Sequence, residues 1–273
     1  MNKIKPKKIR IAIAGALGRM GKYLIKEVQE NKYTTLSAAF VSKNHPLINK
    51  DIGEIIGIGK IGILISDELH EKINTFDVLI DFTKPSSTFK YLKYCSLFKK
   101  NIIIGTTGFS TEEMKKISQY SSDIAIMISA NFSIGINLLL QLIKKTTEII
   151  GHQSDIEIIE SHHRNKIDAP SGTALSIGET ISKVMNWDLK KHSIYSREKI
   201  KNVREKNKIG FSTIRAGDII GKHTVMYASP GEQINITHTA SNRKAFSTGA
   251  IQAAIWIYNK KIGLFNMNDV LSF

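Results

Sequence analysis

A short apolar strand that leads through a glycine-rich turn into a helix constrains the fold of this chain most strongly. Ile9–Ala14 is a β-branched run of the kind that forms buried strands. Gly15-Ala-Leu-Gly-Arg-Met-Gly21 follows it, and Lys22–Glu30 has helical character. This order opens a dinucleotide-binding βαβ unit, because glycines let the backbone approach a pyrophosphate and the free N–H groups at the helix start attract its negative charge.

The spacing of the glycines and the end of the second strand leave the cofactor open. Ala16 stands where the first glycine of G-x-G-x-x-G would be, so a purely structural turn is the alternative. The second strand, Thr35–Val41, lacks at its end the Asp or Glu with which NAD-binding units often bind the ribose 2′-hydroxyl. Lys43, together with Arg19, offers positive charge for a 2′-phosphate instead. We therefore expect NADPH to be used at least as well as NADH.

Strands continue to alternate with helices through the first half of the chain. Apolar runs at 76–83, 101–105 and 123–128 indicate buried strands, and Ser110-Thr-Glu-Glu113 is a capping box that starts a helix. Residues 44–75 are an irregular excursion in which one or two short strands are expected. The alternation predicts a doubly wound parallel sheet of the Rossmann type. Because ligands of such sheets lie outside the carboxyl ends of the strands, three loops are expected to converge on one crevice: Gly15–Gly21, Gly105–Thr107 and Ser129–Phe132.

The pattern changes after a helix that begins at Ser133. Asp155–Glu160 indicates a strand and Gly172–Met185 a helix, and runs between 209 and 240 separated by tight turns indicate an antiparallel meander. Asp188–Lys208 is polar and indicates a loop. We therefore predict an α/β chain of two domains: a dinucleotide-binding domain at 1–132, with 243–273 packed back on it, and an α+β domain at 133–242 with a largely antiparallel sheet.

The segment Glu160–Ala174 carries the residues best suited to acid–base chemistry. Within it, basic side chains lie close together in sequence: His162, His163, Arg164 and Lys166. Histidine exchanges protons near neutral pH, and the start of the helix that follows can bind an anion. A solvated basic loop is the alternative. A zinc site built on the two histidines is disfavoured, because adjacent strand residues point to opposite faces, and we expect no metal.

Composition limits the other classes of function. The net charge of +15 favours anionic partners, but the lysines are scattered along the chain, which disfavours a nucleic-acid-binding patch. No apolar run approaches the roughly 18 residues of a membrane span, so no membrane association is expected. The single cysteine, Cys95, excludes an internal disulfide and indicates a reducing compartment, most simply the cytoplasm.

Several motifs occur here in an order that resembles a known enzyme family. They are Gly15-x-x-Gly-Arg-Met-Gly21, Asp81-Phe-Thr83, Gly105-Thr-Thr-Gly-Phe109, Ala130-Asn-Phe-Ser133, Glu160-x-His-His-x-x-Lys-x-Asp-Ala-Pro-Ser-Gly-Thr-Ala174, Arg215-Ala-Gly-Asp218 and Gly263-Leu-Phe265. Over essentially the whole chain they are similar to the 4-hydroxy-tetrahydrodipicolinate reductases (dihydrodipicolinate reductases) of bacterial lysine and diaminopimelate biosynthesis.

This resemblance implies reduction of the cyclic dicarboxylate 4-hydroxy-tetrahydrodipicolinate to tetrahydrodipicolinate, with hydride from NADPH or NADH, by a homotetramer that assembles through its second domain. It implies that His162 donates and accepts a proton and that Lys166 donates one. The implied substrate contacts are His163, Gly172 and Thr173. The implied cofactor contacts are Gly15, Ala16, Leu17, Gly18, Arg19, Met20, Gly105, Thr106, Thr107, Ser129, Ala130, Asn131 and Phe132. Val41 departs from members of the family that carry an acidic residue there, which leaves the choice between NADH and NADPH open.

Two other functions remain as alternatives. The first is a different NAD(P)-dependent oxidoreductase of small anionic metabolites, such as a semialdehyde dehydrogenase. That enzyme would need a thiol nucleophile, and Cys95 lies in a predicted helix rather than in a loop after a strand. The second is a basic Rossmann-like protein that contacts nucleic acid and would be retained on DNA in a salt-dependent way.

Overall fold

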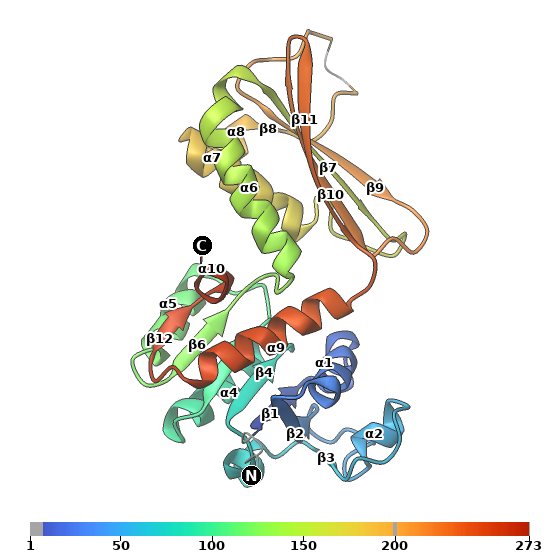
Figure 1. The fold of residues 1–273 in the computed structure, drawn as a ribbon, viewed down its shortest axis with the longest axis vertical. Coiled ribbons are helices and arrows are strands. Elements are labelled where there is room, and N and C mark those ends of the chain that lie inside the picture. Colours follow the sequence, from blue (N-terminus) through green and yellow to red (C-terminus); the bar gives the residue numbers. More distant parts are fainter. Residues whose placement is uncertain (1–7, 199–200, 273) are drawn as a thin grey trace, which may run out of the picture. The chain divides into compact units, whose positions relative to one another are not determined.

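The chain forms two compact units in a computed structural model, which describes residues 8–198 and 201–272 (Figure 1). One unit comprises Met1–Ser133 with Lys244–Phe273, and the other comprises Ile134–Arg243. In the described part of the chain, no helix has the length and apolar character needed to cross a membrane.

The first unit is built on a parallel sheet whose strand order is that of a Rossmann fold. Its strands are β1 (Ile9–Ala14), β2 (Thr34–Phe40), β3 (Ile65–Ser66), β4 (Val78–Asp81), β5 (Asn101–Ile104), β6 (Ala125–Ile128) and β12 (Gly263–Phe265). Their order across the sheet is β3-β2-β1-β4-β5-β6-β12, and every neighbouring pair is parallel. The chain direction across the sheet reverses between β1 and β4, and that reversal is where such sheets bind their ligands.

Helices cover both faces of this sheet. The longer ones are α1 (Arg19–Glu30), α4 (Pro85–Leu97), α5 (Thr111–Tyr120) and α9 (Lys244–Tyr258), and the short ones are α2 (Ile52–Ile55), α3 (Leu69–Lys72), η1 (Ile73–Thr75) and α10 (Met267–Leu271). Leu92 and Cys95 of α4 pack with Ile117 of α5 against the strands on one face. Helices α1 and α9 contact each other, and α9 contacts β4, β5 and β6. The C-terminal segment therefore belongs to the core of the first unit.

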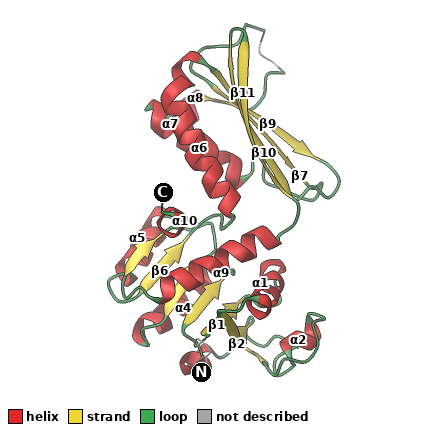
Figure 2. Ribbon diagram, in the orientation of Figure 1, coloured by secondary structure: helices red, strands yellow, loops and turns green. Residues whose placement is uncertain are grey.

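The second unit is a mixed sheet with helices on one face. Its elements are α6 (Ile134–Ile150), η2 (Gly151–Gln153), β7 (Asp155–His162), α7 (Gly172–Met185), α8 (Leu189–His192), β8 (Ser193–Ile194), β9 (Ile209–Arg215), β10 (Gly221–Ser229) and β11 (Glu232–Ala240). The strand order is β11-β10-β7-β9-β8. Figure 2 shows α6 and α7 side by side on this sheet, and their apolar residues share a core with Ile156 and Ile158 of β7.

The predicted fold class is confirmed, with local differences. The antiparallel meander is present only for β10 and β11, because β7 lies between β10 and β9 and pairs with β9 in parallel. The loop predicted at 188–208 contains α8 and β8, since Asp188 caps a helical turn; residues 199 and 200 lie outside the described residues. Residues 44–75 contain one short strand, β3, as predicted, together with several helical turns.

Candidate active site

The glycine turn after β1 has a geometry that only glycine fits. Gly15 has a φ of +78°, and a Cβ there would lie 2.7 Å from the carbonyl oxygen of Phe82. A Cβ on Gly21 would overlap the carbonyl of Gly15, so the missing side chain lets α1 start three residues before the predicted Lys22. The N-cap, Gly18, offers no side-chain oxygen to the first turn, and that turn contains no acidic residue. The start of α1 is therefore suited to an anion such as a pyrophosphate.

A pocket of about 440 Å³ opens at the carboxyl ends of β1, β2 and β4. Its lining includes Gly15 and Gly18 from the glycine turn, Ser42 and His45 from the segment after β2, and Lys84 after β4. This is the point where the strand order reverses, and sheets of this kind bind their ligands at such a point. The positive charge in the lining is that of Lys84, whereas Lys43 is exposed and is not among the lining residues.

The loops after β4, β5 and β6 meet beside this pocket. The backbone N–H of Thr83 donates to Oγ1 of Thr106 at 2.9 Å. A Cβ on Gly105 would overlap the ring of Phe82, and the rings of Phe82 and Phe132 lie 5.7 Å apart. The structure therefore brings Gly105–Thr107 and Ser129–Phe132 to the same edge as the glycine turn.

Asp81 holds these loops together at the end of β4. Its side chain is fully buried at the end of β4 and accepts hydrogen bonds from the hydroxyls of Thr83, Thr88 and Thr106. Burial raises the pKa of Asp81, and the hydroxyl donors only partly oppose this. Asp81 therefore has a structural role beneath the pocket.

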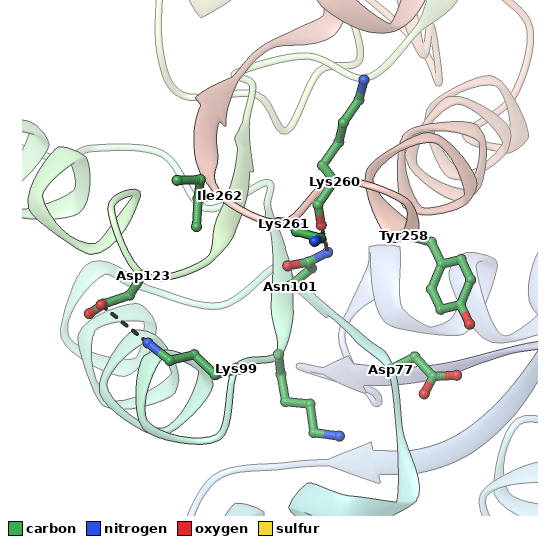
Figure 3. A pocket seen from close by; sticks show the side chains of 9 residues that line it. Asp77, Lys99, Asn101, Asp123, Tyr258, Lys260, Lys261 and Ile262 are labelled. Carbon is green, nitrogen blue, oxygen red and sulfur yellow. Dashed lines mark hydrogen bonds and ion pairs between the residues drawn. The ribbon is translucent and has the colours of Figure 1, made fainter.

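A second pocket of similar volume lies at the opposite edge of the same sheet (Figure 3). It is lined by Lys99, Lys100, Lys260 and Lys261, together with Asp77 and Asp123. Both carboxylates are engaged, Asp77 with Arg10 at 2.6 Å and Asp123 with Lys99 at 3.2 Å. Because these residues stand at the amino ends of β4, β5 and β6, we do not assign the dinucleotide to this pocket.

In the second unit, Glu160 is the centre of a buried polar cluster. One of its oxygens accepts from the guanidinium of Arg215 at 2.7 Å, the backbone N–H of Ser171 at 3.1 Å and the hydroxyl of Thr213 at 3.2 Å. The other accepts from Nδ1 of His162 at 2.5 Å and from Arg215 at 2.9 Å. The alternation of β7 places Glu160 and His162 on one face of the sheet, and β9 places Arg215 beside them.

His162 is held as a neutral, oriented imidazole. Burial lowers its pKa below the usual value, and the hydrogen bond to Glu160 opposes this without cancelling it. Because a carboxylate only accepts hydrogen bonds, Nδ1 carries the proton and Nε2 is left as the basic nitrogen. Nε2 lies over Gly221, where a Cβ would come within 3.1 Å of it.

His223 is a member of this cluster that the sequence analysis missed. Its ring lies 5.0 Å from that of His162, and its Nε2 is 3.0 Å from the hydroxyl of Ser171. Burial and the neighbouring His162 lower the pKa of His223 to about 4, so it is neutral at physiological pH. The pairing of His223 with Glu160 across β10 and β7 depends on strand register, which the sequence alone does not reveal.

The remaining predicted site residues lie in and after the loop that follows β7. Lys166 pairs with Asp168 at 2.8 Å and is close enough to His162 to lower the pKa of that histidine. Gly172 and Thr173 begin α7, whose N-cap Ser171 accepts from Ala174 at 3.2 Å. His163 is half-buried, and Arg164 is exposed with its backbone N–H bonded to Gly217. The loop therefore carries Lys166, and the start of α7 that follows it carries Gly172 and Thr173.

The same cluster has the geometry of a possible cation site. Glu160, His162 and His223 offer ligand atoms within 4.8 Å of one another. However, both carboxylate oxygens already accept from Arg215, whose guanidinium charge would repel a cation. The cluster is therefore poorly suited to hold a cation.

The first unit is a Rossmann-type unit in which the start of α1 is suited to an anion, and the second unit carries a buried histidine site. This is the architecture of a pyridine-nucleotide-dependent oxidoreductase. Residues 9–132 match the family model described as dihydrodipicolinate reductase, N-terminus, and residues 135–271 match the one described as dihydrodipicolinate reductase, C-terminus. The chain belongs to the dihydrodipicolinate reductase family, and it uses a nicotinamide cofactor.

Relatives of known name support this assignment over the full length. The 4-hydroxy-tetrahydrodipicolinate reductase of Buchnera aphidicola subsp. Acyrthosiphon pisum (strain 5A) is 66% identical over 266 residues, which are 97% of this chain and 99% of that protein. The enzyme of the same name from Buchnera aphidicola subsp. Schizaphis graminum (strain Sg) is 64% identical over 269 residues, covering 98% of each. The fold resembles that of the dipicolinate-bound dihydrodipicolinate reductase from Paenisporosarcina sp. TG-14, with a TM-score of 0.76, 24% identity and coverage of 95% of this chain and 98% of that one.

The structure also bears on the semialdehyde dehydrogenase alternative. Cys95 is fully buried in the core beneath the sheet. Burial raises the pKa of its thiol far above the usual value, so the thiolate needed for nucleophilic catalysis does not form.

Proposed function

We propose that this chain reduces 4-hydroxy-tetrahydrodipicolinate to tetrahydrodipicolinate with hydride from NAD(P)H, in lysine and diaminopimelate biosynthesis. The observation that carries the proposal is the placement of a neutral, oriented His162 beside Lys166 and the start of α7. That arrangement combines a proton acceptor, a proton donor and an anion cradle. A cyclic dicarboxylate that must lose water and gain hydride requires these three functions.

The overall chemistry defines what the side chains must supply. In the net reaction a hydride replaces the 4-hydroxyl group, which leaves as water and takes one proton with it. Lys166 is the cationic donor, held by Asp168 at 2.8 Å. His162 accepts and returns protons through Nε2, because its Nδ1 is committed to Glu160. The nicotinamide, when bound, supplies the hydride.

The substrate carboxylates are proposed to bind at the start of α7 and at His163. Helix starts attract anions through backbone N–H groups and the helix dipole. Ser171 holds the first turn in place, since its hydroxyl caps Ala174 and its own N–H is bound by Glu160. Gly172 is exposed, and a side chain there would meet no neighbouring atom, so a ligand can approach the backbone.

The cofactor is proposed to be bound by Gly15–Met20, Gly105–Thr107 and Ser129–Phe132, with NADPH used at least as well as NADH. The lining of the pocket supports this choice, because it lacks a carboxylate and contains Ser42 and His45 from the segment after β2 and Lys84 from the segment after β4. Lys84 is therefore a better-placed partner for a 2′-phosphate than Lys43.

The test is oxidation of NADPH and of NADH, followed at the nicotinamide absorbance band. The substrate is freshly prepared with the synthase that makes 4-hydroxy-tetrahydrodipicolinate. We expect turnover with both cofactors and kcat/KM with NADPH at least equal to that with NADH. A control reaction without substrate should show no oxidation. Absence of oxidation with both cofactors would remove the proposed function, and a strong preference for NADH would remove the proposal for the 2′-phosphate.

We also propose that the chain forms a homotetramer through the open face of its second sheet. Helices α6 and α7 pack on one face of the sheet (Figure 2). The alternation of side chains along the strands places Ile159, Ile214, Thr224 and Met226 on the other face. Ile214 is 47% exposed. Light scattering should give four times the chain mass of 30.5 kDa. Met226→Lys places a charge on the proposed interface and should lower the measured mass of the assembly. A wild-type monomer would contradict the proposal.

A further inference from the structure

Glu160 stands out in the second unit because one buried carboxylate receives hydrogen bonds from several separate elements. His162 belongs to the same strand, Thr213 and Arg215 belong to β9, and Ser171 precedes α7. Only 1% of Glu160 is exposed. A carboxylate so placed sets the relative positions of every group that binds it.

The first group it orients is the proposed proton-transfer histidine. The contact at Nδ1 selects the tautomer with a basic Nε2 and fixes the ring over Gly221. The second group is the start of α7, because the backbone N–H of Ser171 donates to the same carboxylate. Arg215 reinforces both, since it also donates to the backbone carbonyl of Asp168 at 2.6 Å and so holds the loop between β7 and α7.

We propose that Glu160 is a positioning residue that ties the acid–base histidine on β7 to the anion cradle at the start of α7. This inference rests on the proposed function of His162 and of Gly172 and Thr173. It gives Arg215 a role as the counter-charge that keeps the carboxylate ionised and in place. Loss of the carboxylate should therefore disturb catalysis and substrate binding together while leaving the cofactor site in the first unit unchanged.

The test uses Glu160→Gln, which keeps the shape of the side chain. An amide has one accepting oxygen and one donating NH₂ group, so the NH₂ must face donors from Arg215 or His162. We expect kcat to fall roughly 10²-fold or more, because an imidazole in the wrong tautomer is a poor base. Affinity for dipicolinate, measured by calorimetry, should fall about tenfold, while affinity for NADPH should be unchanged.

Glu148→Gln is the control. Glu148 lies on α6 of the same unit and pairs with Lys145 at 3.4 Å, and its side chain is 39% exposed. All three measurements should stay near wild type in this variant. Wild-type kcat and dipicolinate affinity in a folded Glu160→Gln protein would overturn the proposal.

A spectroscopic measurement separates positioning from general stability. Nitrogen-15 NMR of labelled histidines, with His162 assigned by its loss in His162→Gln, should show the neutral Nδ1–H tautomer in the wild type and a different tautomer in Glu160→Gln. The charged and titratable groups around Glu160 and His162 also influence the protonation of His162 in these spectra. They are Arg215 on β9, Lys166 and Asp168 on the loop, His223 on β10 and His238 on β11.

The wild-type spectrum tests the role of Glu160 even if the Glu160→Gln variant does not fold. A neutral Nε2–H tautomer of His162 in the wild type would overturn the inference without any variant. If the wild type fails to turn over substrate with either cofactor, the proposed function falls. The dipicolinate and NMR measurements still test the role of Glu160 in that case.

Discussion

Replacement of His162 by Gln together with Lys166 by Met is expected to lower kcat by at least the roughly 10²–10⁴-fold that one general acid or base contributes. His162 is 8% exposed, and its Nδ1 is committed to Glu160. Lys166 lies close enough to influence its charge. His163 differs from His162 in this respect, because no hydrogen bond to Glu160 is among its described contacts.

The single variants show whether the two side chains act as a pair. If they serve the same proton transfers, their effects on kcat will be less than multiplicative. NADPH affinity should not change, because the glycine turn is untouched. His152→Gln, an exposed histidine of the same unit, serves as the control and should be neutral. Near-native kcat in the double variant would falsify the assignment of both residues.

The fold was predictable because its signals are local. Strand β1, the capping box at Ser110 and the bounds of α7 follow from hydrophobic periodicity and capping residues. The pairing of β9 with β7 was not predictable, because the short turn after Arg215 indicates a hairpin with β10. Strand order in a mixed sheet depends on packing between distant segments, and the sequence signal for it is weak.

The candidate site, like the fold, could be predicted from the sequence only in part. The segment from Glu160 to Thr173 could be proposed from the sequence because its basic residues are adjacent in sequence. Arg215 and His223 were not assigned roles, since they reach Glu160 and His162 only through the register of β9 and β10. A usable signal existed for Glu160: it is two residues from His162 on a strand, so both side chains share one face.

Substitution of Arg215 by Met is expected to have the largest effect on stability. It would leave the carboxylate of Glu160 buried without its guanidinium partner, which typically costs about 3–5 kcal/mol. Arg215 also donates to the carbonyls of Asp168 and Ile214, so the loop before α7 would loosen as well. Urea unfolding at fixed protein concentration should show the loss in the free energy of unfolding.

The dependence of this loss on pH identifies its cause. In the wild type, burial acts to raise the pKa of Glu160, but hydrogen bonds from Arg215 and His162 outweigh it and hold the pKa below its usual value. The carboxylate therefore contributes stability above the pKa of the unfolded state, and this contribution is lost as pH falls through the folded pKa. Without Arg215, burial dominates and the folded pKa rises above the unfolded value. The destabilisation should then be largest at about pH 8 and smaller at about pH 5.

Arg204→Met is the control that separates the effect of an unpaired buried carboxylate from the effect of losing any arginine. Arg204 is as buried as Arg215, each with 18% of its side chain exposed, but its partners Asp155 and Glu157 are 55% and 26% exposed. Water can solvate those carboxylates, so the loss should be smaller and nearly independent of pH. Adding Glu160→Gln to Arg215→Met should recover part of the lost stability, because it removes the unpaired charge. An unfolding free energy of Arg215→Met within about 1 kcal/mol of wild type at pH 8 would show that Glu160 does not depend on its guanidinium partner.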